Sequence, residues 1–578
     1  MNRIPFIPEN APFTAEQRMW LNGFLAGVFS NANPPGATAL ASTLGLDAGP
    51  KTPLVLLYGS QTGTAEGRGF APKLVSMEKY SDVDLTKEEN VLVITSTYGE
   101  GDPPDMAAAF WNWLKADTAP KLDHLRYSVL ALGDTNYAAF CEFGKKCDER
   151  FAALGAKRVA DRKDCDVEYE TPAAEWTAIV FDALGAAAQS SPGTNGSTPE
   201  TSEGASTWSR KKPFPARLLT NRRLSAEGSG KDVRHFEISL AGSGLTYEVG
   251  DALGVIPSNC PALVAEILAT LGCDGEEAVK TADGEMPLRL ALTQHFDITK
   301  PSAELLAAAA KHSPSAVFAP LLDPSKKDEL KKWLFGREIM DVLGCLTVPL
   351  PPQEFVALLK KIAPRLYSIS SSLKAHPDEV HLTVAAVRYD AHGRNRKGIA
   401  STFLADRVGE TGDLPVYIQP SHGFKPPANG DTPMIMVGPG TGIAPFRAFL
   451  EERLATGAKG RNWLLFGDQK RATDFLYQEQ LERWAKDGHL TRLDLAFSRD
   501  QAEKIYVQSR MLEASAELWA WLEAGAHFYV CGDASRMAKD VDAALHTIIE
   551  KEGGKSADDA NAYVERLKSE KRYQRDVY

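Results

Sequence analysis

Residues 53–64 read PLVLLYGSQTGT, an apolar run followed at once by a turn rich in glycine and hydroxyl side chains. Two further segments have the same form, NVLVITSTYGEG at 90–101 and YSVLALGD at 127–134. Short apolar runs that alternate with helical stretches are typical of a parallel α/β sheet. The carboxyl ends of parallel strands meet at one edge, where open α/β sheets bind ligands. We therefore predict a parallel sheet with three ligand-binding loops at one edge.

The turn after the first run suits a phosphate, because glycine lets the backbone approach an anion and hydroxyl and N–H groups can bind it. Alone, an ordinary polar turn is an equal alternative. Tyr98 and Tyr137 shift the balance, since they offer flat faces to a ring beside that turn. The predicted contacts are Ser60, Gln61, Thr62, Gly63 and Thr64 in the first loop, Ser96, Thr97, Tyr98, Gly99 and Gly101 in the second, and Leu132, Gly133, Asp134 and Tyr137 in the third.

Composition limits the function classes. A chain of 578 residues is too long for one core, and its net charge of −11 argues against nucleic acid as the main partner. Counting 22 acids and 15 bases, residues 51–185 carry −7 of that charge. The seven cysteines form no CxxC pair, so we predict reduced thiols in the cytoplasm and no metal site. The best membrane candidate, 20–29, is too short to span, and the first residues lack a signal-peptide pattern.

The pattern changes along the chain. Residues 189–207, QSSPGTNGSTPETSEGAST, offer almost nothing to bury and predict a flexible linker. After it we expect antiparallel strands at 216–239 and 247–257, then a mainly helical stretch to about residue 359. Strands return at 365–369 and 381–387. From residue 433 the strand–helix alternation is again regular, with the predicted strands MIMVG, NWLLFG, RLDLAFS and HFYVCGD.

The last of these regions carries a second phosphate turn. Residues 438–442, GPGTG, follow the strand MIMVG and open a helix, although they are not the GxGxxG fingerprint. Cations and hydroxyls at the end of the third strand suit the 2′-phosphate of NADPH, which a carboxylate would repel. Alone, that cluster is more often a solvated polar face. The predicted contacts are Gly440, Thr441, Ser498, Arg499, Lys504, Tyr506 and Gln508.

These motifs, in this order, resemble the NADPH-dependent diflavin reductases. YGSQTGTAE, TSTYGEGDPP and ALGDTNYAAFCEFGK are similar to the phosphate loop and the two isoalloxazine loops of their flavodoxin-like FMN domain. RLYSISSS at 365–372 resembles the FAD signature of the ferredoxin–NADP reductases, where a plain strand and turn is the simpler alternative. The resemblance extends from Pro53 to Tyr578. It adds Phe140 and Cys141 to the FMN loop, and its FAD and nucleotide contacts are Arg365, Tyr367, Ser368, Thr383, Gly398, Ala400, Ser401, Asp533 and Tyr578.

The resemblance also implies roles in hydride transfer. Arg365 would neutralise the FAD pyrophosphate, Tyr367 would lie against the flavin and Ser368 would reach its reactive edge. Cys531 would stand where nicotinamide meets flavin, with Asp576 beside it. The terminal aromatic Tyr578 would cover the flavin and move aside for nicotinamide. The implied catalytic residues are Ser368, Cys531, Asp576 and Tyr578.

The implied activity is transfer of a hydride from NADPH to FAD, and then of single electrons through FMN to a separate metalloprotein. The segments YQRDVY, NWLLFGDQ and LAFSRDQAEKIYVQ are most similar to flavoprotein subunits of assimilatory sulfite reductases, whose acceptor is a sirohaem haemoprotein. Two alternatives stay open. One is a diflavin reductase for another acceptor, such as a cytochrome P-450 or a nitrate-reducing partner. The other is an FMN-deficient assembly subunit.

One feature of the sequence supports the alternative of an FMN-deficient assembly subunit. Only residues 65–71 stand between the first phosphate loop and the predicted strand PKLVSM, and a parallel crossover with its helix needs about 10–12 residues. Either the crossover is remodelled or the sequence lacks residues there. A separate question is the segment 14–29, whose apolar residues have helical spacing and predict an assembly element or a helix packed on the first sheet. Those residues are Trp20, Leu21, Phe24, Leu25 and Val28.

The predicted fold class is therefore multidomain α/β. A flavodoxin-like parallel sheet comes first, an antiparallel β-barrel FAD domain with a helical insert second, and a ferredoxin–NADP-reductase-like α/β domain third. The predicted boundaries are 1–50 for an N-terminal extension, 51–188 for the FMN domain, 189–207 for the linker, 208–432 for the FAD domain with its insert at about 259–359, and 433–578 for the NADPH domain.

Overall fold

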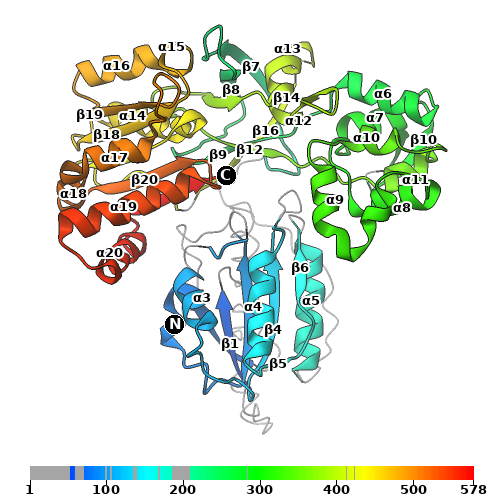
Figure 1. Ribbon diagram of the computed structural model, residues 1–578, viewed down its shortest axis with the longest axis horizontal. Coiled ribbons are helices and arrows are strands. Elements are labelled where there is room, and N and C mark those ends of the chain that lie inside the picture. Colours follow the sequence, from blue (N-terminus) through cyan, green and yellow to red (C-terminus); the bar gives the residue numbers. More distant parts are fainter. Residues whose placement is uncertain are drawn as a thin grey trace, which may run out of the picture.

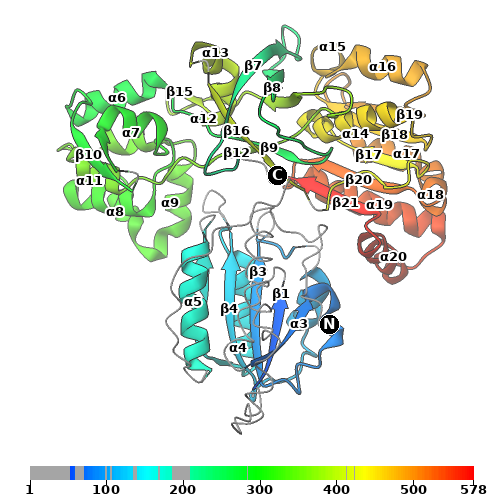
Figure 2. The ribbon, with the colours of Figure 1, turned by 180° about the vertical axis from the view of Figure 1, so that it is seen from behind.

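The computed structural model describes residues 52–58, 70–97, 101–104, 107–133, 139–166, 169–184, 208–282, 284–411, 413–421 and 423–578. Figure 1 shows the flavodoxin-like sheet as one lobe, with an antiparallel sheet, a helical insert and a second parallel sheet arranged along the other side of the molecule. In both views the C-terminus lies at the centre, where the lobes face one another (Figures 1 and 2). No helix among the described residues has the length and apolar character needed to cross a membrane.

The first lobe has an all-parallel sheet in the order β2-β1-β3-β4-β5, with β6 paired to β4. This is the strand order of flavodoxin, so the predicted parallel sheet is confirmed. The elements are β1 (Thr52–Tyr58), β2 (Phe70–Ser76), the 3-10 helix η2 (Met77–Asp82), β3 (Asn90–Ser96), α3 (Ala108–Lys115), β4 (Arg126–Leu132), α4 (Glu142–Ala153), β5 (Lys157–Arg158), β6 (Lys163–Cys165) and α5 (Glu170–Ala183).

Alternation along β3 explains why helices cover both faces. Val91 and Val93 join the core beneath α3 and α4, whereas Leu92 and Ile94 join a second core beneath α5. Successive side chains of a strand point to opposite faces, and a run of apolar residues therefore needs cover on both. The run VLVI in β3 is covered in this way, by α3 and α4 on one face and by α5 on the other. All three polar loops then leave the carboxyl edge of the sheet.

The connection between β1 and β2 is short. β2 begins at Phe70, two residues before the predicted strand, and Phe70 is the register partner of Thr52. The chain must therefore return along the whole of β1, about 20 Å, within residues 59–69. A helix of that length takes about 13 residues. These eleven residues are fewer than a full crossover helix with its two turns requires.

The second lobe is an antiparallel sheet in the order β12-β9-β16-β7-β8-β13. An isolated bridge between Ile369 and Leu382 brings its two edges together, so the sheet curls as the predicted barrel does. Its elements are β7 (Phe214–Arg223), β8 (Val233–Ser239), β9 (Ala252–Val255), β12 (Arg365–Ser368), β13 (Glu379–Ala385), the hairpin β14 (Arg388–Ala391) and β15 (Arg394–Lys397), α12 (Ile399–Thr402), the π-helical turn η6 (Phe403–Arg407), α13 (Val408–Thr411) and β16 (Leu414–Gln419).

The helical insert stands between β9 and β12 and has its own hydrophobic core around Val264, Ile267 and Phe355. It carries the short hairpin of β10 and β11 as well as helices. Its elements are α6 (Pro261–Leu271), β10 (Ala278–Thr281), β11 (Gly284–Pro287), α7 (Leu288–Gln294), α8 (Ala303–His312), η4 (Ala319–Leu322), η5 (Pro324–Lys326), α9 (Lys327–Leu334), α10 (Ile339–Leu343) and α11 (Pro352–Ala357).

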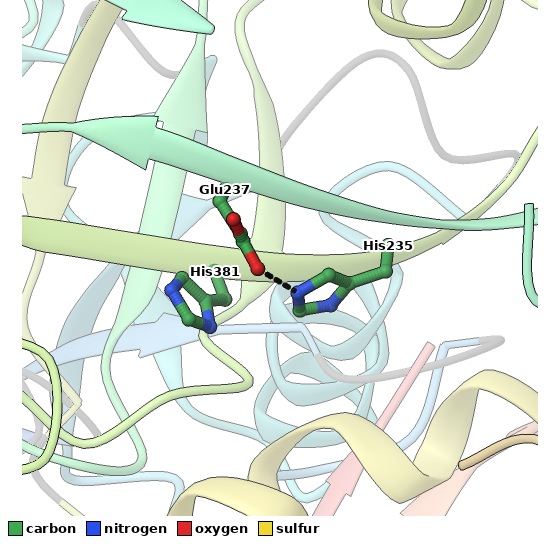
Figure 3. A group of neighbouring side chains, drawn as sticks. All are labelled: His235, Glu237 and His381. Carbon is green, nitrogen blue, oxygen red and sulfur yellow. Dashed lines mark hydrogen bonds and ion pairs between the residues drawn. The ribbon is translucent and has the colours of Figure 1, made fainter. Parts of the chain in front are cut away.

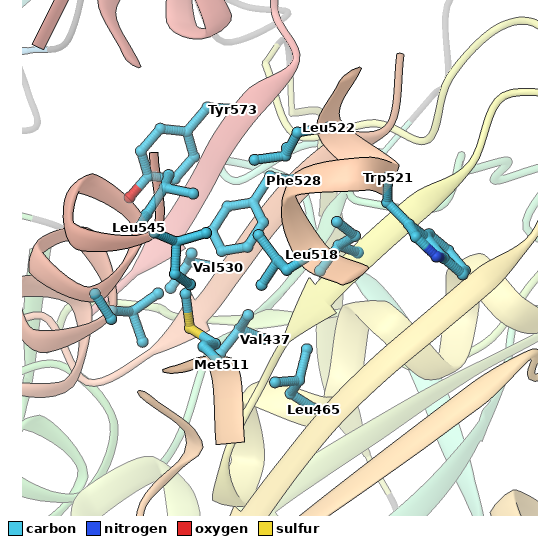
Figure 4. Close-up of a cluster of buried hydrophobic side chains, with 14 of the residues drawn as sticks. Val437, Leu465, Met511, Leu518, Trp521, Leu522, Phe528, Val530, Leu545 and Tyr573 are labelled. Carbon is cyan, nitrogen blue, oxygen red and sulfur yellow. The ribbon is translucent and has the colours of Figure 1, made fainter. Parts of the chain in front are cut away.

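The third lobe is a parallel sheet in the order β19-β18-β17-β20-β21, with the C-terminal strand at one edge. Figure 4 shows one of its cores, with Phe528 near the centre, Leu545 on one side of it and Trp521 on the other. The elements are β17 (Met434–Val437), η7 (Gly440–Gly442), α14 (Ile443–Thr456), β18 (Asn462–Asp468), α15 (Arg471–Asp474), α16 (Gln478–Lys486), β19 (Arg492–Phe497), α17 (Val507–Glu513), α18 (Ser515–Glu523), β20 (His527–Gly532), α19 (Met537–Gly553), α20 (Ala557–Ser569) and β21 (Tyr573–Val577).

A buried polar network joins the second and third lobes. The ring of His235 in β8 hydrogen-bonds Glu237 through Nε2 at 3.2 Å and the Tyr477 hydroxyl through Nδ1 at 2.9 Å. The hydroxyl of Thr383 in β13 lies 2.6 Å from that same Tyr477 oxygen. Tyr477 comes from the segment before α16, so barrel and nucleotide lobe share these bonds. Figure 3 shows His235 and Glu237 with His381 of the neighbouring strand beside them.

Arg447 of α14 provides the positive charge of this network. Its guanidinium donates to Ser370 O at 2.6 Å and pairs with Glu451 at 2.7 Å. Burial, reinforced by that charge, lowers the pKa of His235 to about 3 and of His381 to about 4. His235, Glu237 and His381 hold potential metal-ligand atoms within 4.8 Å of one another. Both nitrogens of His235 already have partners, however, and a nearby guanidinium opposes a second cation.

The network predicts loss of stability in acid. Both rings are neutral when folded, while their unfolded pKa is about 6.5, so the unfolded chain binds more protons below that pH. The free energy of unfolding should therefore fall as pH drops from about 6.5 toward 4, by up to about 1.4 kcal/mol per pH unit for each histidine. Urea unfolding followed by fluorescence over a pH series measures this slope.

His235→Gln should flatten the slope because it removes one of the two titrating rings. The matched control is the same substitution outside the network, His392→Gln at the exposed turn of the β14–β15 hairpin. Equal slopes in the wild-type protein and His235→Gln would contradict the assignment.

Candidate functional site

Three of the four predicted catalytic residues meet where β12 faces the C-terminal strand. Ser368 ends β12, and its hydroxyl donates to Asp576 Oδ2 at 2.7 Å. The Cys531 thiol lies 3.8 Å from that oxygen. Cys531 and Asp576 are register partners in the parallel pair β20–β21. The pairing of the last two strands thus presents a thiol and a carboxyl group side by side to the barrel.

Burial controls the protonation of this group. It raises the pKa of the Asp576 carboxyl, against the smaller opposing effects of hydrogen bonds from Ser368 and Cys531. It also raises the pKa of the Cys531 thiol well above its ordinary value. The thiol therefore stays protonated at neutral pH. Ser368 and Cys531 both direct hydrogen towards the one carboxyl oxygen.

The fourth predicted catalytic residue, Tyr578, is held through its backbone and through its ring hydroxyl. Its N–H donates to Gly532 O at 3.0 Å, and its carbonyl accepts from Ala534 N at 3.2 Å. The side chain is 59% exposed. Its hydroxyl lies 2.9 Å from the Thr441 hydroxyl of the GPGTG turn. A ring that is exposed but anchored at its backbone can move without detaching β21.

The GPGTG turn depends on glycine at three positions for two reasons. A Cβ on Gly442 would stand 2.1 Å from Cys531 O, so this glycine packs the turn against β20. A Cβ on Gly438 would stand 2.5 Å from Gly442 O and 2.6 Å from the Phe446 ring, so that glycine packs the turn against the start of α14. Gly440 has φ +59° and faces open space, apart from Asp468 and Lys231 nearly 4 Å away. The turn opens α14, so it offers backbone N–H groups to an anion.

The residues predicted for the 2′-phosphate all follow β19, from Ser498 directly after the strand to Gln508 in the first turn of α17. Ser498 N donates to Asp468 O at 2.9 Å, and Arg499 N to Gln469 O at 2.7 Å, which fixes the two strand ends side by side. The side chains of Arg499, Lys504 and Tyr506 are exposed. Gln508 donates to Asp540 at 3.2 Å. Asp533 accepts hydrogen bonds from Arg536 N and Met537 N and so caps the start of α19.

The predicted FAD contacts divide between open and enclosed positions. Arg365 is exposed in β12 and Tyr367 is partly buried beside it. Ser401 accepts a hydrogen bond from Val387 N at 3.1 Å, and a Cβ on Gly398 would lie 2.7 Å from its hydroxyl. This close approach requires glycine where α12 begins, next to the buried Ala400. Thr383, in contrast, uses its hydroxyl in the bond to Tyr477.

A pocket of about 400 Å³ opens beside the start of α12, between the barrel and the insert. Sequence reasoning did not find it, because its walls come from four separate segments with no shared motif. Cations outnumber acids among its lining residues, which suits an anionic ligand. The charged lining residues are Glu266, Glu338, Arg394, Lys397 and Arg407.

Part of the predicted FMN site lies within the described residues. Thr97 N donates to Leu132 O at 3.3 Å, and the Thr97 hydroxyl accepts from Phe143 N at 3.1 Å. Lys146 donates to Gly101 O at 2.7 Å. Gly133 N donates to Cys165 O at 2.9 Å. These bonds hold the starts of the second and third loops together at the carboxyl edge, where Ser96 and Leu132 end their strands.

Phe140 and Cys141 precede α4 directly. The Cys141 thiol is buried and donates towards Ala131 O at 3.4 Å, so its side chain faces the core rather than the loops. Burial raises its pKa to about 12. A Cβ on Gly133 would lie 2.9 Å from both Phe140 and Cys141, which packs the third loop onto this turn. The predicted contacts Ser60, Gln61, Thr62, Gly63, Thr64, Tyr98, Gly99, Asp134 and Tyr137 lie outside the described residues.

Family models match each of the three sheets. Residues 56–176 match the flavodoxin model, residues 206–403 the FAD binding domain and residues 436–543 the oxidoreductase NAD-binding domain. Their order is the order of lobes described above. The fold class predicted from the sequence is therefore confirmed.

Curated relatives match the chain nearly from end to end. It is 46% identical to the sulfite reductase (NADPH) flavoprotein alpha-component of Bacillus subtilis (strain 168), over 98% of this chain and 96% of the relative. It is 41% identical to the protein of that name from Vibrio vulnificus (strain CMCP6), over 100% and 96%. Identity to the protein of that name from Escherichia coli O9:H4 (strain HS) is 43%, over 98% and 95%.

Proposed function

This chain belongs to the family of the sulfite reductase (NADPH) flavoprotein alpha-components, and we propose that it delivers electrons from NADPH to a separate sulfite-reducing haemoprotein. It is an NADPH-dependent diflavin oxidoreductase with domains for FAD, FMN and the nicotinamide nucleotide. Bound FAD and FMN supply the conversion of a two-electron hydride donor into single-electron steps. The observation that carries the proposal is the meeting of Ser368, Cys531 and Asp576 between the FAD-binding and nucleotide-binding domains.

We assign proton handling to that group. Ser368 and Asp576 share a hydrogen bond, and burial raises the pKa of the Asp576 carboxyl, which favours its protonated form and suits a group that would give up and take back a proton. The protonated, buried Cys531 thiol fills the place beside it without adding charge. Tyr578, exposed and anchored only through its backbone and Thr441, would cover the site and exclude water.

The FAD contacts follow from charge and close approach. The exposed Arg365 and the cationic pocket beside α12 suit the two phosphates and the sugar of a dinucleotide. Gly398, Ala400 and Ser401 bring the backbone close to that pocket. Tyr367 would lie against the flavin ring. Thr383 would contribute through its backbone, because its hydroxyl bonds Tyr477.

We propose an NADPH site and an FMN site, also from the charges and the backbone geometry of the residues concerned. Gly440 and Thr441 would hold the pyrophosphate of NADPH, and Ser498, Arg499, Lys504, Tyr506 and Gln508 its 2′-phosphate, with Asp533 fixing the end of β20. For FMN we retain all three predicted loops together with Phe140 and Cys141. Thr97 and Gly133 have the backbone bonds to hold their loops at the carboxyl edge, and the Cys141 contact would be through its backbone.

The remaining proposals concern boundaries, assembly and location. We retain the predicted domain boundaries at 51–188, 208–432 and 433–578, joined by the linker 189–207. Association of copies through the N-terminal segment 14–29, which lies outside the described residues, remains a proposal. All seven cysteines are free thiols, which supports a reducing, cytoplasmic location.

The nucleotide site predicts a preference that mutation can remove. Arg499→Ala with Lys504→Ala should lower kcat/KM for NADPH at least about a hundredfold and hardly affect NADH, because charge-assisted contacts are worth about 1.5–3 kcal/mol each. Steady-state ferricyanide reduction with both nucleotides measures it. Lys459→Ala with Lys486→Ala, exposed cations remote from the turn, is the matched control. Equal losses with NADPH and NADH would refute the assignment.

Variants at the FAD site and at the FMN site should lose activity with different electron acceptors. Arg365→Ala should reduce activity at least tenfold with ferricyanide and with cytochrome c, because it weakens the first flavin site. Tyr137→Ala should spare ferricyanide and impair only cytochrome c reduction. Arg217→Ala, another exposed arginine of the barrel, serves as the control. Flavin released by heat gives the content directly: FAD without FMN would favour the assembly-subunit alternative, and identical activity profiles of both variants would exclude the two-site path.

Docking on the acceptor should depend on salt. The flavodoxin-like region carries −7, with Asp102 exposed beside Glu142 near its carboxyl edge. Surface charges steer encounter and are screened over about 8 Å at physiological ionic strength. Sulfite-dependent NADPH oxidation with purified haemoprotein should slow several-fold between about 0.05 and 0.3 M salt, while ferricyanide reduction changes little.

Asp102→Lys with Asp105→Lys should reproduce the high-salt rate. Glu89→Lys with Asp117→Lys makes the same charge change at the other end of the sheet and should have little effect. If neither salt nor Asp102→Lys with Asp105→Lys changes the rate, the docking surface lies elsewhere. Normal flavin reduction with no transfer to the haemoprotein would instead favour another acceptor.

A further inference from the structure

An ion pair joins the barrel to the nucleotide lobe at the GPGTG turn. Lys231 stands in the β7–β8 connection, and Asp468 is the last residue of β18. The lysine ammonium lies 2.5 Å from Asp468 Oδ1. The Asp468 side chain is completely buried, whereas that of Lys231 is 35% exposed. The carboxylate of Asp468 is therefore buried in the nucleotide lobe, whereas the ammonium of Lys231 is accessible to a ligand.

The pair faces the open side of Gly440. A Cβ on Gly440 would lie 3.8 Å from Asp468 Oδ2 and 3.9 Å from the Lys231 ammonium. Gly440 belongs to the turn that opens α14, which has fourteen residues. An anion held by this turn would thus have the cation and the buried carboxylate as immediate neighbours.

The carboxylate is only half satisfied. Asp468 Oδ1 accepts from Lys231 and from Gln469 N at 2.7 Å, but Oδ2 is buried without a hydrogen-bond partner. Burial raises the pKa of Asp468 despite the neighbouring lysine. A carboxylate that served only to tie the two lobes together would use both oxygens, because a buried unpaired oxygen is costly. The observed geometry leaves one oxygen directed at the turn.

Lys231 is held in place from its backbone. Its N–H donates to the Ser229 hydroxyl at 3.0 Å, and its carbonyl accepts from the Ser225 hydroxyl at 2.9 Å. The same connection is fixed to the nucleotide lobe by a bond from Ser229 to Asp474 at 2.5 Å. The ammonium is therefore positioned beside Gly440 by the fold. A small rotation of its flexible stem would turn it from Asp468 to an anion on the turn.

We propose that Asp468 limits the affinity for the nicotinamide nucleotide by competing with its diphosphate for the ammonium of Lys231. Without nucleotide, Asp468 holds the cation. With a diphosphate on the turn, Lys231 is shared, and the partly released carboxylate repels the ligand. The oxidised nucleotide then leaves more readily than it would if Lys231 were free. The inference rests on the proposed nucleotide site and assigns to it a residue that weakens binding.

Calorimetric titration of the full-length flavoprotein with NADP⁺ tests this competition, and 2′-AMP, which lacks the diphosphate, reports the 2′-phosphate site separately. Asp468→Asn should tighten NADP⁺ about tenfold, since one like charge beside the ligand is removed and a cation is released. It should change 2′-AMP affinity less than twofold. Lys231→Met should weaken NADP⁺ about tenfold and spare 2′-AMP.

The double variant isolates the coupling. Competition needs both partners, so adding Asp468→Asn to Lys231→Met should tighten NADP⁺ less than Asp468→Asn does alone. The matched control is Glu452→Gln, which breaks another pair between these lobes, Lys374 to Glu452 at 2.5 Å, and should leave both ligands unaffected.

The outcomes separate two failures. If the wild-type protein binds neither NADP⁺ nor 2′-AMP, the proposed nucleotide site is wrong. If it binds both but Asp468→Asn leaves NADP⁺ unchanged or weaker, the competition is overturned and Asp468 is an anchor between lobes. Should Asp468→Asn fail to fold, Lys231→Met decides alone: unchanged NADP⁺ affinity in that variant overturns the inference.

Discussion

The hydrogen bond from Ser368 to Asp576 crosses between the barrel and the nucleotide-binding domain, and the geometry of the site depends on it. Asp576 reaches the barrel only because β21 adds in parallel to β20, which sets it opposite Cys531. The same pairing ends at Tyr578, whose hydroxyl meets Thr441 of the nucleotide turn. Register in one edge strand therefore aligns the flavin side, the nucleotide side and the terminal ring.

That alignment needs the two domains to keep a fixed angle, which apolar contact alone does not give because it has no direction. Hydrogen bonds from His235 and Thr383 to Tyr477 and from Arg447 to Ser370 supply the direction. All of these groups are largely withdrawn from water. Removing one partner would therefore leave buried polar groups without hydrogen bonds, at a cost in folding free energy. Neutral histidine is the form that fits beside the Arg447 guanidinium.

Much of this could be predicted from the sequence because the signals are local. Apolar runs ending in glycine-rich turns predicted β1, β17 and β20 and the loops after them, and the order of motifs predicted the three folds. The pairing of Lys231 with Asp468 could not be predicted, since 237 residues separate them and neither belongs to a motif. Thr383 was predicted as a cofactor contact, but its hydroxyl has a partner in another domain that its own segment does not reveal.

The flavodoxin-like lobe shows how far strand pairing constrains a chain that departs from its family. β1 and β2 are parallel along seven residue pairs, so the chain between them must return about 20 Å. Eleven residues are ample for an extended return, at up to about 3.3 Å each, but too few for a helix that rises 1.5 Å per residue. The parallel pairing of β1 and β2 is therefore compatible with a connection shorter than a full crossover helix requires.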